Sequence, residues 1–453
     1  MTRSLRGKSV VVVGAGLAGL TAAVELQRQG AAVTVLEGQG RVGGRVLTIR
    51  DGFVEGQHAE AGADFIDEAH EEVCRLVHSF NLKLVPVLRA GFSFVLSSDG
   101  KVRRAAPGGG IWKRLTHQLA PLIRAYRLSE QRWDGAVAKE LGSMSVADWM
   151  QGTSLPAEVR EMLVGLRGFF LADPGNLSLL SLVDQVASGS PGKGGMYRIA
   201  GGNDRLPEAL ASILRDRLLL RHEALAVSQS NTTVRVRIRA GDHETWLRSD
   251  FLVLALPATR VRMLDIRPPL PREQAAAIST LAYGPVTKTL LQFDRRFWKK
   301  PNQRLAYGTN LPIGAVWDAN EQQKGRAGIL CLMAGGTTSE ATRRLLSGSG
   351  TAGLVRALDW LGKRRRNLVA MRSVTWEKNP WVQGGYAVFG PRFDPTLRSW
   401  LARPCGRILF AGEQTSLQWQ GYMNGAVESG LRAAAEIQAL SREQVKNRDR
   451  LLS

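Results

Sequence analysis

The chain has 453 residues, 44% of them hydrophobic, and a formal net charge of +21. It is long enough for a large core and two domains. Its three cysteines, Cys74, Cys331 and Cys405, have no metal-ligand spacing and no even count, so they favour a reducing compartment over a disulfide framework. A strand signal begins at Ser9 and no apolar run could span a bilayer. We therefore expect a cytoplasmic protein with neither a signal peptide nor a membrane anchor.

The positive charge gathers in three basic clusters, Lys101–Arg104, Arg295–Lys300 and Lys363–Arg366. Such a field attracts nucleic acids and anionic membranes. No nucleic-acid-binding motif accompanies the clusters. We therefore expect solvated surface charge and no nucleic-acid partner.

The first 45 residues carry the strongest local signal. The apolar run Val10–Val13 predicts a buried parallel strand, and a helical pattern covers Leu17–Gln29. Between them stand Gly14, Gly16 and Gly19, at the spacing G-x-G-x-x-G. Gly14 permits the tight turn, Gly16 a close approach of the backbone to a pyrophosphate, and Gly19 close packing of helix on strand. The helix N-terminus would then offer free N–H groups to the phosphates.

A second predicted strand, Ala31–Leu36, leads to Glu37. This acid is placed to accept hydrogen bonds from an adenosine ribose, which completes a dinucleotide-binding pattern. The run Arg41-Val-Gly-Gly-Arg45 follows, and Arg45 can reach a pyrophosphate. An R-x-G-G-R sequence directly after the acid resembles the flavoproteins with two dinucleotide motifs, so it favours FAD over NAD.

The segment Glu60–Asp67, E-A-G-A-D-F-I-D, resembles the part of the flavin amine oxidases that passes under the flavin. Gly62 and Ala63 are small, as backbone beside a flat ring requires. The resemblance implies that Asp67 binds a distal ammonium group; the alternative is a helix N-cap or a surface acid. Phe65 stands where L-amino-acid oxidases have a carboxylate-binding arginine, so the usual carboxylate clamp is absent.

The middle of the chain is less specific. Residues 69–194 have a helical pattern broken by prolines such as Pro121, which suits a helical substrate lobe. Strands are predicted at His222–Val227, Thr232–Ile238 and Phe251–Pro257, the last one ending at a turn. The family resemblance implies that Val227 contacts the adenine through its backbone.

Lys288 lies in Tyr283–Phe293, which alternates like a strand. It matches the lysine that amine oxidases hold near flavin N5 through a water, and we favour this role over the alternative of an edge-strand lysine facing solvent. A lysine in an apolar strand is costly unless it has a partner. Further along, Gly353–Arg364 has a helical pattern.

Trp376–Tyr386 resembles the segment that returns to the flavin, and it places Trp381 among the cofactor contacts. Some monoamine oxidases carry a cysteine, bonded to the flavin, just before the matching tyrosine. Here that position is Gly385. We therefore expect FAD to be held noncovalently.

The last motif begins with a strand that ends at Gly412 and is followed by Glu413, placed to accept a ribityl hydroxyl. A helix is predicted to start near Tyr422, beside the cofactor contacts Gly421 and Met423. Its N–H groups and dipole can stabilise negative charge on the reduced flavin.

The resemblance covers nearly the whole chain and implies an α/β fold, a two-domain flavoprotein as in the monoamine oxidases. The FAD-binding domain would comprise residues 1–68, 195–280 and 379–440, with a Rossmann-like core. The α+β substrate-binding domain would comprise residues 69–194 and 281–378, and residues 441–453 would form a polar C-terminal tail.

The resemblance also implies an FAD-dependent amine oxidase. Tyr386 and Tyr422 would form two walls of an aromatic cage for the amine, with Lys288 as the third catalytic residue. Hydride would pass from the amine-bearing carbon to the flavin, the imine would hydrolyse to a carbonyl compound, and oxygen would be reduced to hydrogen peroxide. We assign no metal and no histidine as a base.

Alternative functions remain open at this point. They are an L-amino-acid oxidase with atypical carboxylate recognition, an FAD-dependent desaturase, and a weakly active flavin-binding protein with a basic interaction surface. The sequence also leaves open which amine is oxidised, whether another electron acceptor replaces oxygen, and whether the chain forms a homodimer.

Overall fold

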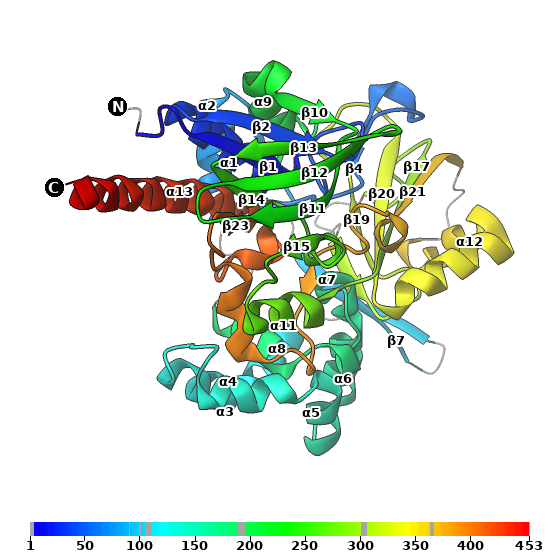
Figure 1. Cartoon of the computed structure of the whole chain (residues 1–453). Coiled ribbons are helices and arrows are strands. Elements are labelled where there is room, and N and C mark those ends of the chain that lie inside the picture. The colour runs from blue at the N-terminus through cyan, green and yellow to red at the C-terminus, as the bar shows by residue number, and fades with distance from the viewer. Residues whose placement is uncertain are drawn as a thin grey trace.

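The structure is a computed structural model that describes residues 4–452, apart from residues 90, 99–100, 105–109, 189–194, 300–305 and 363–366. The basic cluster at residues 363–366 therefore lies outside the described residues. In the ribbon view, the strands of the chain group into two main sheets, and several helices gather at one end (Figure 1).

A five-stranded parallel sheet in the order β10-β2-β1-β14-β23 carries the glycine-rich motif (Figure 1). Its strands are β1 (Ser9–Val13), β2 (Ala32–Glu37), β10 (Leu218–Leu220), β14 (Phe251–Leu254) and β23 (Ile408–Phe410). The strands predicted around β1, β2 and β14 are confirmed. All five lie in the segments that the sequence analysis assigns to the FAD-binding domain, and the division itself stays a prediction.

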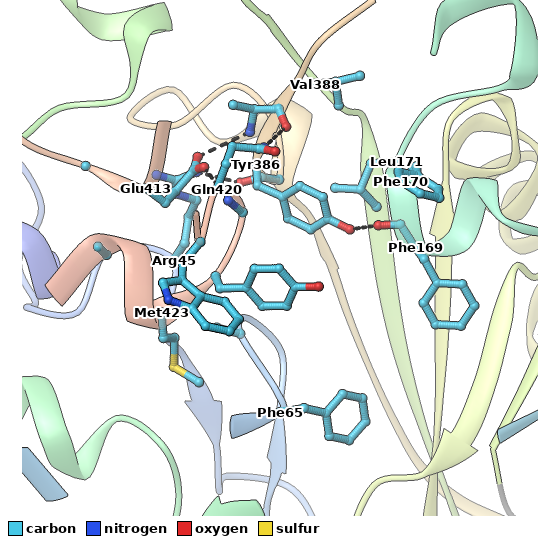
Figure 2. Close-up of a pocket in the computed structure, with 18 of the residues that line it drawn as sticks. Arg45, Phe65, Phe169, Phe170, Leu171, Tyr386, Val388, Glu413, Gln420 and Met423 are labelled. Carbon is cyan, nitrogen blue, oxygen red and sulfur yellow. Dashed lines mark hydrogen bonds and ion pairs between the residues drawn. The ribbon is translucent and has the colours of Figure 1, made fainter. Parts of the chain in front are cut away.

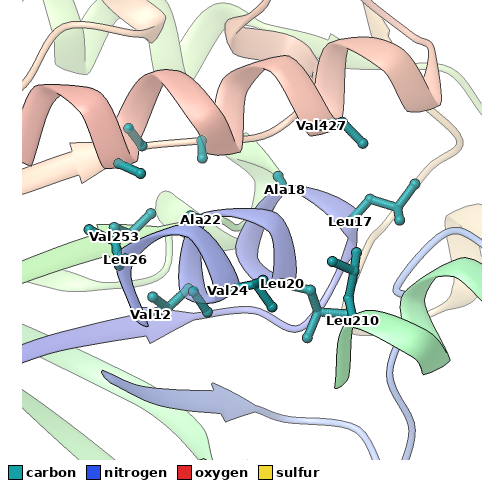
Figure 3. Close-up of a cluster of buried hydrophobic side chains, with 14 of the residues drawn as sticks. Val12, Leu17, Ala18, Leu20, Ala22, Val24, Leu26, Leu210, Val253 and Val427 are labelled. Atoms are coloured by element: carbon teal, nitrogen blue, oxygen red, sulfur yellow. The ribbon is translucent and has the colours of Figure 1, made fainter. Parts of the chain in front are cut away.

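Helix α1 (Leu17–Arg28) packs between this sheet and α13 (Met423–Leu452), as Figure 3 shows. Small residues let the two helices approach: a Cβ added at Gly430 would lie 2.4 Å from the carbonyl oxygen of Ala18. Helix α13 continues without a break through residues 441–452, the segment expected to form a polar tail. The first turn of α1 is therefore pressed against elements from both ends of the chain.

A seven-stranded sheet in the order β21-β17-β20-β19-β18-β7-β8 forms the second layer. Its strands are β7 (Phe92–Ser98), β8 (Lys101–Arg104), β17 (Val286–Phe293), β18 (Ala306–Thr309), β19 (Ala315–Asp318), β20 (Gly328–Gly335) and β21 (Leu368–Thr375). Strand β17 pairs on both sides, with β20 and β21, and all its residues are buried. The strand carrying Lys288 is thus a central strand, which excludes the solvent-facing alternative for that lysine.

The helical lobe lies beside the second sheet (Figure 1). It comprises α3 (Gly110–Leu128), α4 (Ala136–Ser143), α5 (Val146–Gly152), α6 (Ala157–Gly165), α7 (Arg167–Phe170) and α8 (Leu179–Ala187). The predicted break at Pro121 is wrong, because α3 runs through it. Proline has no N–H, so the carbonyl of His117 loses its helical hydrogen bond to residue 121. His117 and Pro121 both face solvent, so water can donate to that carbonyl instead.

Two further helical predictions are wrong. Residues 84–104 form β6 (Leu84–Val87), β7 and β8 rather than helix, and β7 buries the short apolar run Phe94–Leu96, which suits a strand as well as a helix. The helix expected over Gly353–Arg364 lies earlier, as α12 (Thr337–Arg356), with only the 3-10 turn Asp359–Leu361 after it. Three glycines inside α12 lower its helical propensity, so the sequence pattern did not predict a helix over most of its length.

Smaller elements complete the frame. A four-stranded sheet joins β11 (Glu223–Gln229), β12 (Val234–Ala240), β13 (His243–Ser249) and β15 (Asp265–Arg267), and it confirms the two strands predicted there. A three-stranded sheet consists of β5 (Ile66–Asp67), β9 (Met196–Ile199) and β6. Two strand pairs consist of β3 (Thr48–Ile49) with β4 (Ala59–Glu60), and of β16 (Ala282–Tyr283) with β22 (Ala387–Val388). The other helices are α2 (Glu71–Ser79), α9 (Arg205–Leu214), α10 (Ala258–Val261) and α11 (Arg272–Thr280).

Candidate active site

A cavity of about 2470 Å³ extends from the ends of β1 and β2 to the second sheet and the helical lobe. Ordinary small-molecule pockets measure roughly 300–1,000 Å³, so this cavity has room for a dinucleotide and a substrate together. It is lined by all the predicted site residues except Gly19 and Val227. Gly19 instead serves helix packing, as predicted, because a Cβ there would lie 1.9 Å from the Gly14 carbonyl oxygen.

Val227 does not reach the cavity. It is buried within β11, and its neighbours Glu223 and Ala224 line the cavity in its place. The strand that carries Val227 thus reaches the cavity through Glu223 and Ala224. The backbone contact of Val227 with the adenine stays a prediction of the family resemblance.

The glycine-rich turn forms a cradle suited to phosphates. Gly14 has φ +106°, and Gly16 caps α1 without any side-chain hydrogen bond. The first turn of α1 carries no acidic residue, and a Cβ added at Gly16 would meet no atom within 4 Å. The free N–H groups of α1 therefore face open space at the cavity, which fits the pyrophosphate of a dinucleotide.

Glu37 and Trp381 line the same end of the cavity as the glycine-rich turn. The Glu37 carboxylate accepts hydrogen bonds from the N–H groups of Ala15 and Gln39, both at 2.8 Å, and burial raises its pKa. A Cβ added at Gly38 would lie 2.2 Å from the Trp381 ring. Trp381 thus packs next to the acid that ends β2.

Arg45 and Glu413 form an ion pair at 2.7 Å that joins three distant segments (Figure 2). Arg45 also donates to the Gly385 carbonyl at 2.9 Å, and Glu413 accepts from the N–H groups of Gly421 at 2.8 Å and Ala387 at 3.2 Å. Both residues line the cavity, where the sequence predicts contacts with pyrophosphate and ribityl groups. Their first role in the structure is to hold the cavity wall together.

The two predicted cage tyrosines both face the cavity. The Tyr386 hydroxyl donates a hydrogen bond to the Phe169 carbonyl, so its ring points from the Glu413 side towards the phenylalanines (Figure 2). Tyr422 is 38% exposed, and it lines the cavity. Burial of Tyr386 and desolvation of Tyr422 at the cavity wall raise the pKa of both phenols, so both stay neutral.

Apolar side chains form the wall beyond Tyr386. Phe65, Phe169, Phe170 and Leu171 line it together with Phe92 (Figure 2). The Phe92 and Phe169 rings lie 4.7 Å apart, and Phe65 lies 5.3 Å from the Trp317 ring. This wall would bind an apolar group.

Lys288 donates to three acceptors of the chain. Its Nζ lies 3.0 Å from the carbonyl oxygens of Glu60 and Gly62 and 2.8 Å from Asp64 Oδ2. Arg198 Nε donates to the other oxygen of Asp64 at 2.6 Å. Sequence reasoning missed Asp64 and Arg198; an acid inside the apolar run E-A-G-A-D-F-I was the signal that could have revealed the first.

His70 was also missed. It is 2% exposed, lines the cavity, and packs edge-on against Trp419 at 5.0 Å and Tyr422 at 5.1 Å. Its Nδ1 accepts the N–H of Asp67 at 3.0 Å, and burial lowers its pKa to about 4, so the ring is neutral. The sequence analysis assigned no histidine as a base, and the neutral His70 on the cavity wall leaves that prediction untested.

Asp67 also lines the cavity. Its Oδ1 accepts the N–H of Ala69 at 2.9 Å. The N-cap of α2 is His70 rather than Asp67, which excludes the helix-cap alternative.

The chain matches the family model described as flavin containing amine oxidoreductase over residues 17–438. The chain belongs to this family. Its members are oxidoreductases that act on CH–NH2 or CH–NH groups, so the cofactor is FAD. The described residues that line the cavity include no cysteine, in keeping with noncovalent binding.

Several relatives match over almost their full length. AofH of Mycobacterium tuberculosis, named as a flavin-containing monoamine oxidase, is 29% identical, with 95% of this chain and 96% of AofH aligned. Amine oxidase A of Sus scrofa is 26% identical over 94% of this chain and 84% of its own length.

Solved structures confirm the fold. Cyclohexylamine oxidase of Brevibacterium oxydans superposes with a TM-score of 0.85 at 25% identity, covering 95% of this chain and 99% of that one. A putrescine oxidase bound to putrescine superposes with a TM-score of 0.83 at 24% identity, covering 95% and 99%. Among the described helices, none has the length and apolar character needed to cross a bilayer.

Proposed function

We propose that this protein oxidises a primary or secondary amine borne on an apolar group, giving an imine that water hydrolyses to a carbonyl compound. The main support for this proposal is that the phosphate cradle at Gly16, the two tyrosines Tyr386 and Tyr422, and the phenylalanine wall all line one cavity. FAD supplies the hydride acceptor, and molecular oxygen is the proposed final electron acceptor. The chain's own residues bind and orient the amine.

The aromatic walls suit an amine in the form that can react. A nitrogen lone pair must be free to push hydride from the neighbouring carbon, so the amine has to lose its proton in the site. The neutral Tyr386 and Tyr422 phenols and the apolar wall disfavour a buried charge and so favour the neutral amine. The ring faces still attract whatever positive charge develops on nitrogen.

The charge of the cavity differs from that of the whole chain. Eight Asp or Glu residues and seven Lys or Arg residues line it, whereas the chain as a whole carries +21. The cavity therefore does not continue the basic field of the surface, and an incoming ammonium ion meets no net excess of cations there.

Phe65 argues against an amino acid as the substrate. It occupies the position of the carboxylate-binding arginine in the L-amino-acid oxidases, and its ring covers the Arg198 guanidinium at 5.2 Å. A diamine is the second candidate, because the Asp67 carboxylate lies on the cavity wall, where it could pair with a second ammonium group.

The test is anaerobic reduction of the bound flavin, monitored through the loss of its visible absorbance. The panel contains benzylamine, cyclohexylamine, putrescine and L-leucine, mixed with wild type, Tyr386→Phe and Tyr386→Leu. We expect reduction by the apolar monoamines and little change for Tyr386→Phe. For Tyr386→Leu, which loses the ring, the second-order rate constant of flavin reduction should fall about 5- to 30-fold. Reduction by none of the amines would refute the proposal, and preference for putrescine would establish the diamine alternative.

A further inference from the structure

Asp64 lies at the centre of a buried charge cluster beside the cavity. Its Oδ2 accepts hydrogen bonds from Lys288 Nζ at 2.8 Å and Trp317 Nε1 at 3.1 Å, and its Oδ1 accepts from Arg198 Nε at 2.6 Å. The side chains of Asp64, Lys288 and Arg198 are only 6%, 3% and 1% exposed. One carboxylate therefore faces two buried cations.

All three N–H bonds of the Lys288 ammonium have acceptors within the chain. An ammonium group has three donors and no acceptor. Here the carbonyls of Glu60 and Gly62 and the carboxylate of Asp64 receive them at 2.8–3.0 Å. The role suggested by the family resemblance, holding a water for the flavin, needs a donor that this arrangement has already used.

The other titratable groups near Lys288 do not replace Asp64 as a counter-charge. Burial, followed by repulsion from Asp64, raises the pKa of Glu60 to about 8, so Glu60 is largely protonated at neutral pH. Burial raises the pKa of Cys331 to about 12, so that thiol is neutral. Burial is the largest influence on the pKa of Lys288 and lowers it, but the charge and hydrogen bond of Asp64, with contributions from Cys331 and Glu60, together outweigh burial and the net shift is upward.

We propose that Asp64 is a positioning residue which, together with Arg198, fixes Lys288 as a permanent cation on the cavity wall formed by Gly62 and Ala63. The inference rests on the proposed function for the placement of the flavin ring against that wall. Lys288 then acts through its charge, favouring negative charge on the neighbouring ring, and neither transfers a proton nor holds a water.

The experiment measures the midpoint potential of the bound flavin against pH. The variants are Asp64→Asn, which keeps the shape of the side chain, and Asp64→Asn combined with Lys288→Met. Asp318→Asn is the matched control: Asp318 is 1% exposed and accepts from Trp298 Nε1 at 2.9 Å, without a contact to Lys288. Reduction by a chemical donor makes the measurement independent of any amine, so it still decides the matter if the proposed substrate is wrong.

Asp64→Asn removes one negative charge, so its potential should lie above that of wild type at low pH. With its counter-charge gone, Lys288 should lose its proton at a lower pH than in wild type, and the potential should then fall in a step. Wild type and Asp318→Asn should lack this Lys288 step and show at most the titration of Glu60, whose pKa is about 8. The double variant keeps Glu60 and lacks Lys288, so it should lack the Lys288 step as well.

Two results would overturn the proposal. One is an Asp64→Asn profile identical to that of wild type. The other is persistence of the Asp64→Asn step in the double variant, which would assign the titration to Glu60. If Asp64→Asn does not fold, Lys288→Met alone decides: its potential should lie below that of wild type at every pH, and an unchanged potential would refute a charge-based role.

Discussion

The ion pair between Arg45 and Glu413 should contribute strongly to the stability of the fold without cofactor, and Glu413→Gln tests this. Glu413 accepts hydrogen bonds on both oxygens, from Arg45 and Ala387 on one and from Gly421 on the other. An amide has only one acceptor oxygen. At least one buried N–H would then face an NH2 group and remain unpaired.

The magnitude follows from the burial of the two partners. Breaking a fully buried pair costs about 3–5 kcal/mol. The Glu413 side chain is 6% exposed, but the Arg45 side chain is 24% exposed towards the cavity, where water screens part of the charge. An unpaired Gly421 N–H adds about 1–3 kcal/mol. We expect Glu413→Gln to lower the free energy of unfolding of the apoprotein by about 2–4 kcal/mol in total.

Urea denaturation of the apoprotein measures this loss, and flavin fluorescence measures the dissociation constant for FAD, which should rise at least about tenfold. Glu436→Gln is the matched control, because Glu436 pairs with Arg432 at 2.9 Å on α13 with 27% exposure of each side chain. It should cost no more than about 0.5 kcal/mol. A loss for Glu413→Gln no larger than the control's would show that the pair does not hold the wall.

Three further predictions concern single positions. Gly14→Ala should lower the melting temperature with or without FAD, because its Cβ would lie 2.6 Å from the Ala255 carbonyl oxygen at φ +106°. Gly16→Ala should leave the melting temperature of the apoprotein unchanged and weaken FAD binding, because its Cβ meets no atom within 4 Å. Equal melting temperatures of the two apoprotein variants would contradict this. Phe169→Ala should raise KM for small apolar amines and admit bulkier ones, since it removes a ring from the cavity wall but keeps the carbonyl that binds Tyr386; steady-state kinetics over an amine size series checks it. The pKa of His70 falls from 6.5 to about 4 on folding, so the unfolded chain binds more protons than the folded chain between these pH values. Acidification over that range should therefore lower the free energy of unfolding of wild type by up to about 3 kcal/mol more than that of His70→Gln. Urea titrations at a series of pH values measure this difference.

The sequence was most informative where structure is set locally. The strand, turn and helix around Gly14 and Gly16 depend on residues within one short segment, and the structure confirms them. The strands at residues 84–104 were mistaken for helix, because short apolar runs are ambiguous between the two periodicities.

Most residues that the sequence analysis named do line the cavity, but their contacts could not be predicted. Lys288 and Asp64 are separated by 224 residues, and Asp64 and Arg198 by 134. His70 likewise owes its burial to Trp419 and Tyr422, which come from the far end of the chain. No local pattern records which distant side chain will neutralise a buried charge.

The walls of the cavity come from the first and last parts of the chain, which has a consequence for synthesis. Val13 and Ala426 both line the cavity, and Arg45 meets Glu413 across 368 residues. At roughly 5–20 residues per second, roughly 20–80 s separate the emergence of the glycine-rich turn from that of α13. Throughout that interval the nascent chain has a phosphate cradle with no second wall. We therefore expect stable retention of FAD only once α13 has been made, and a chain that ends before α13 should bind FAD more weakly than the full chain.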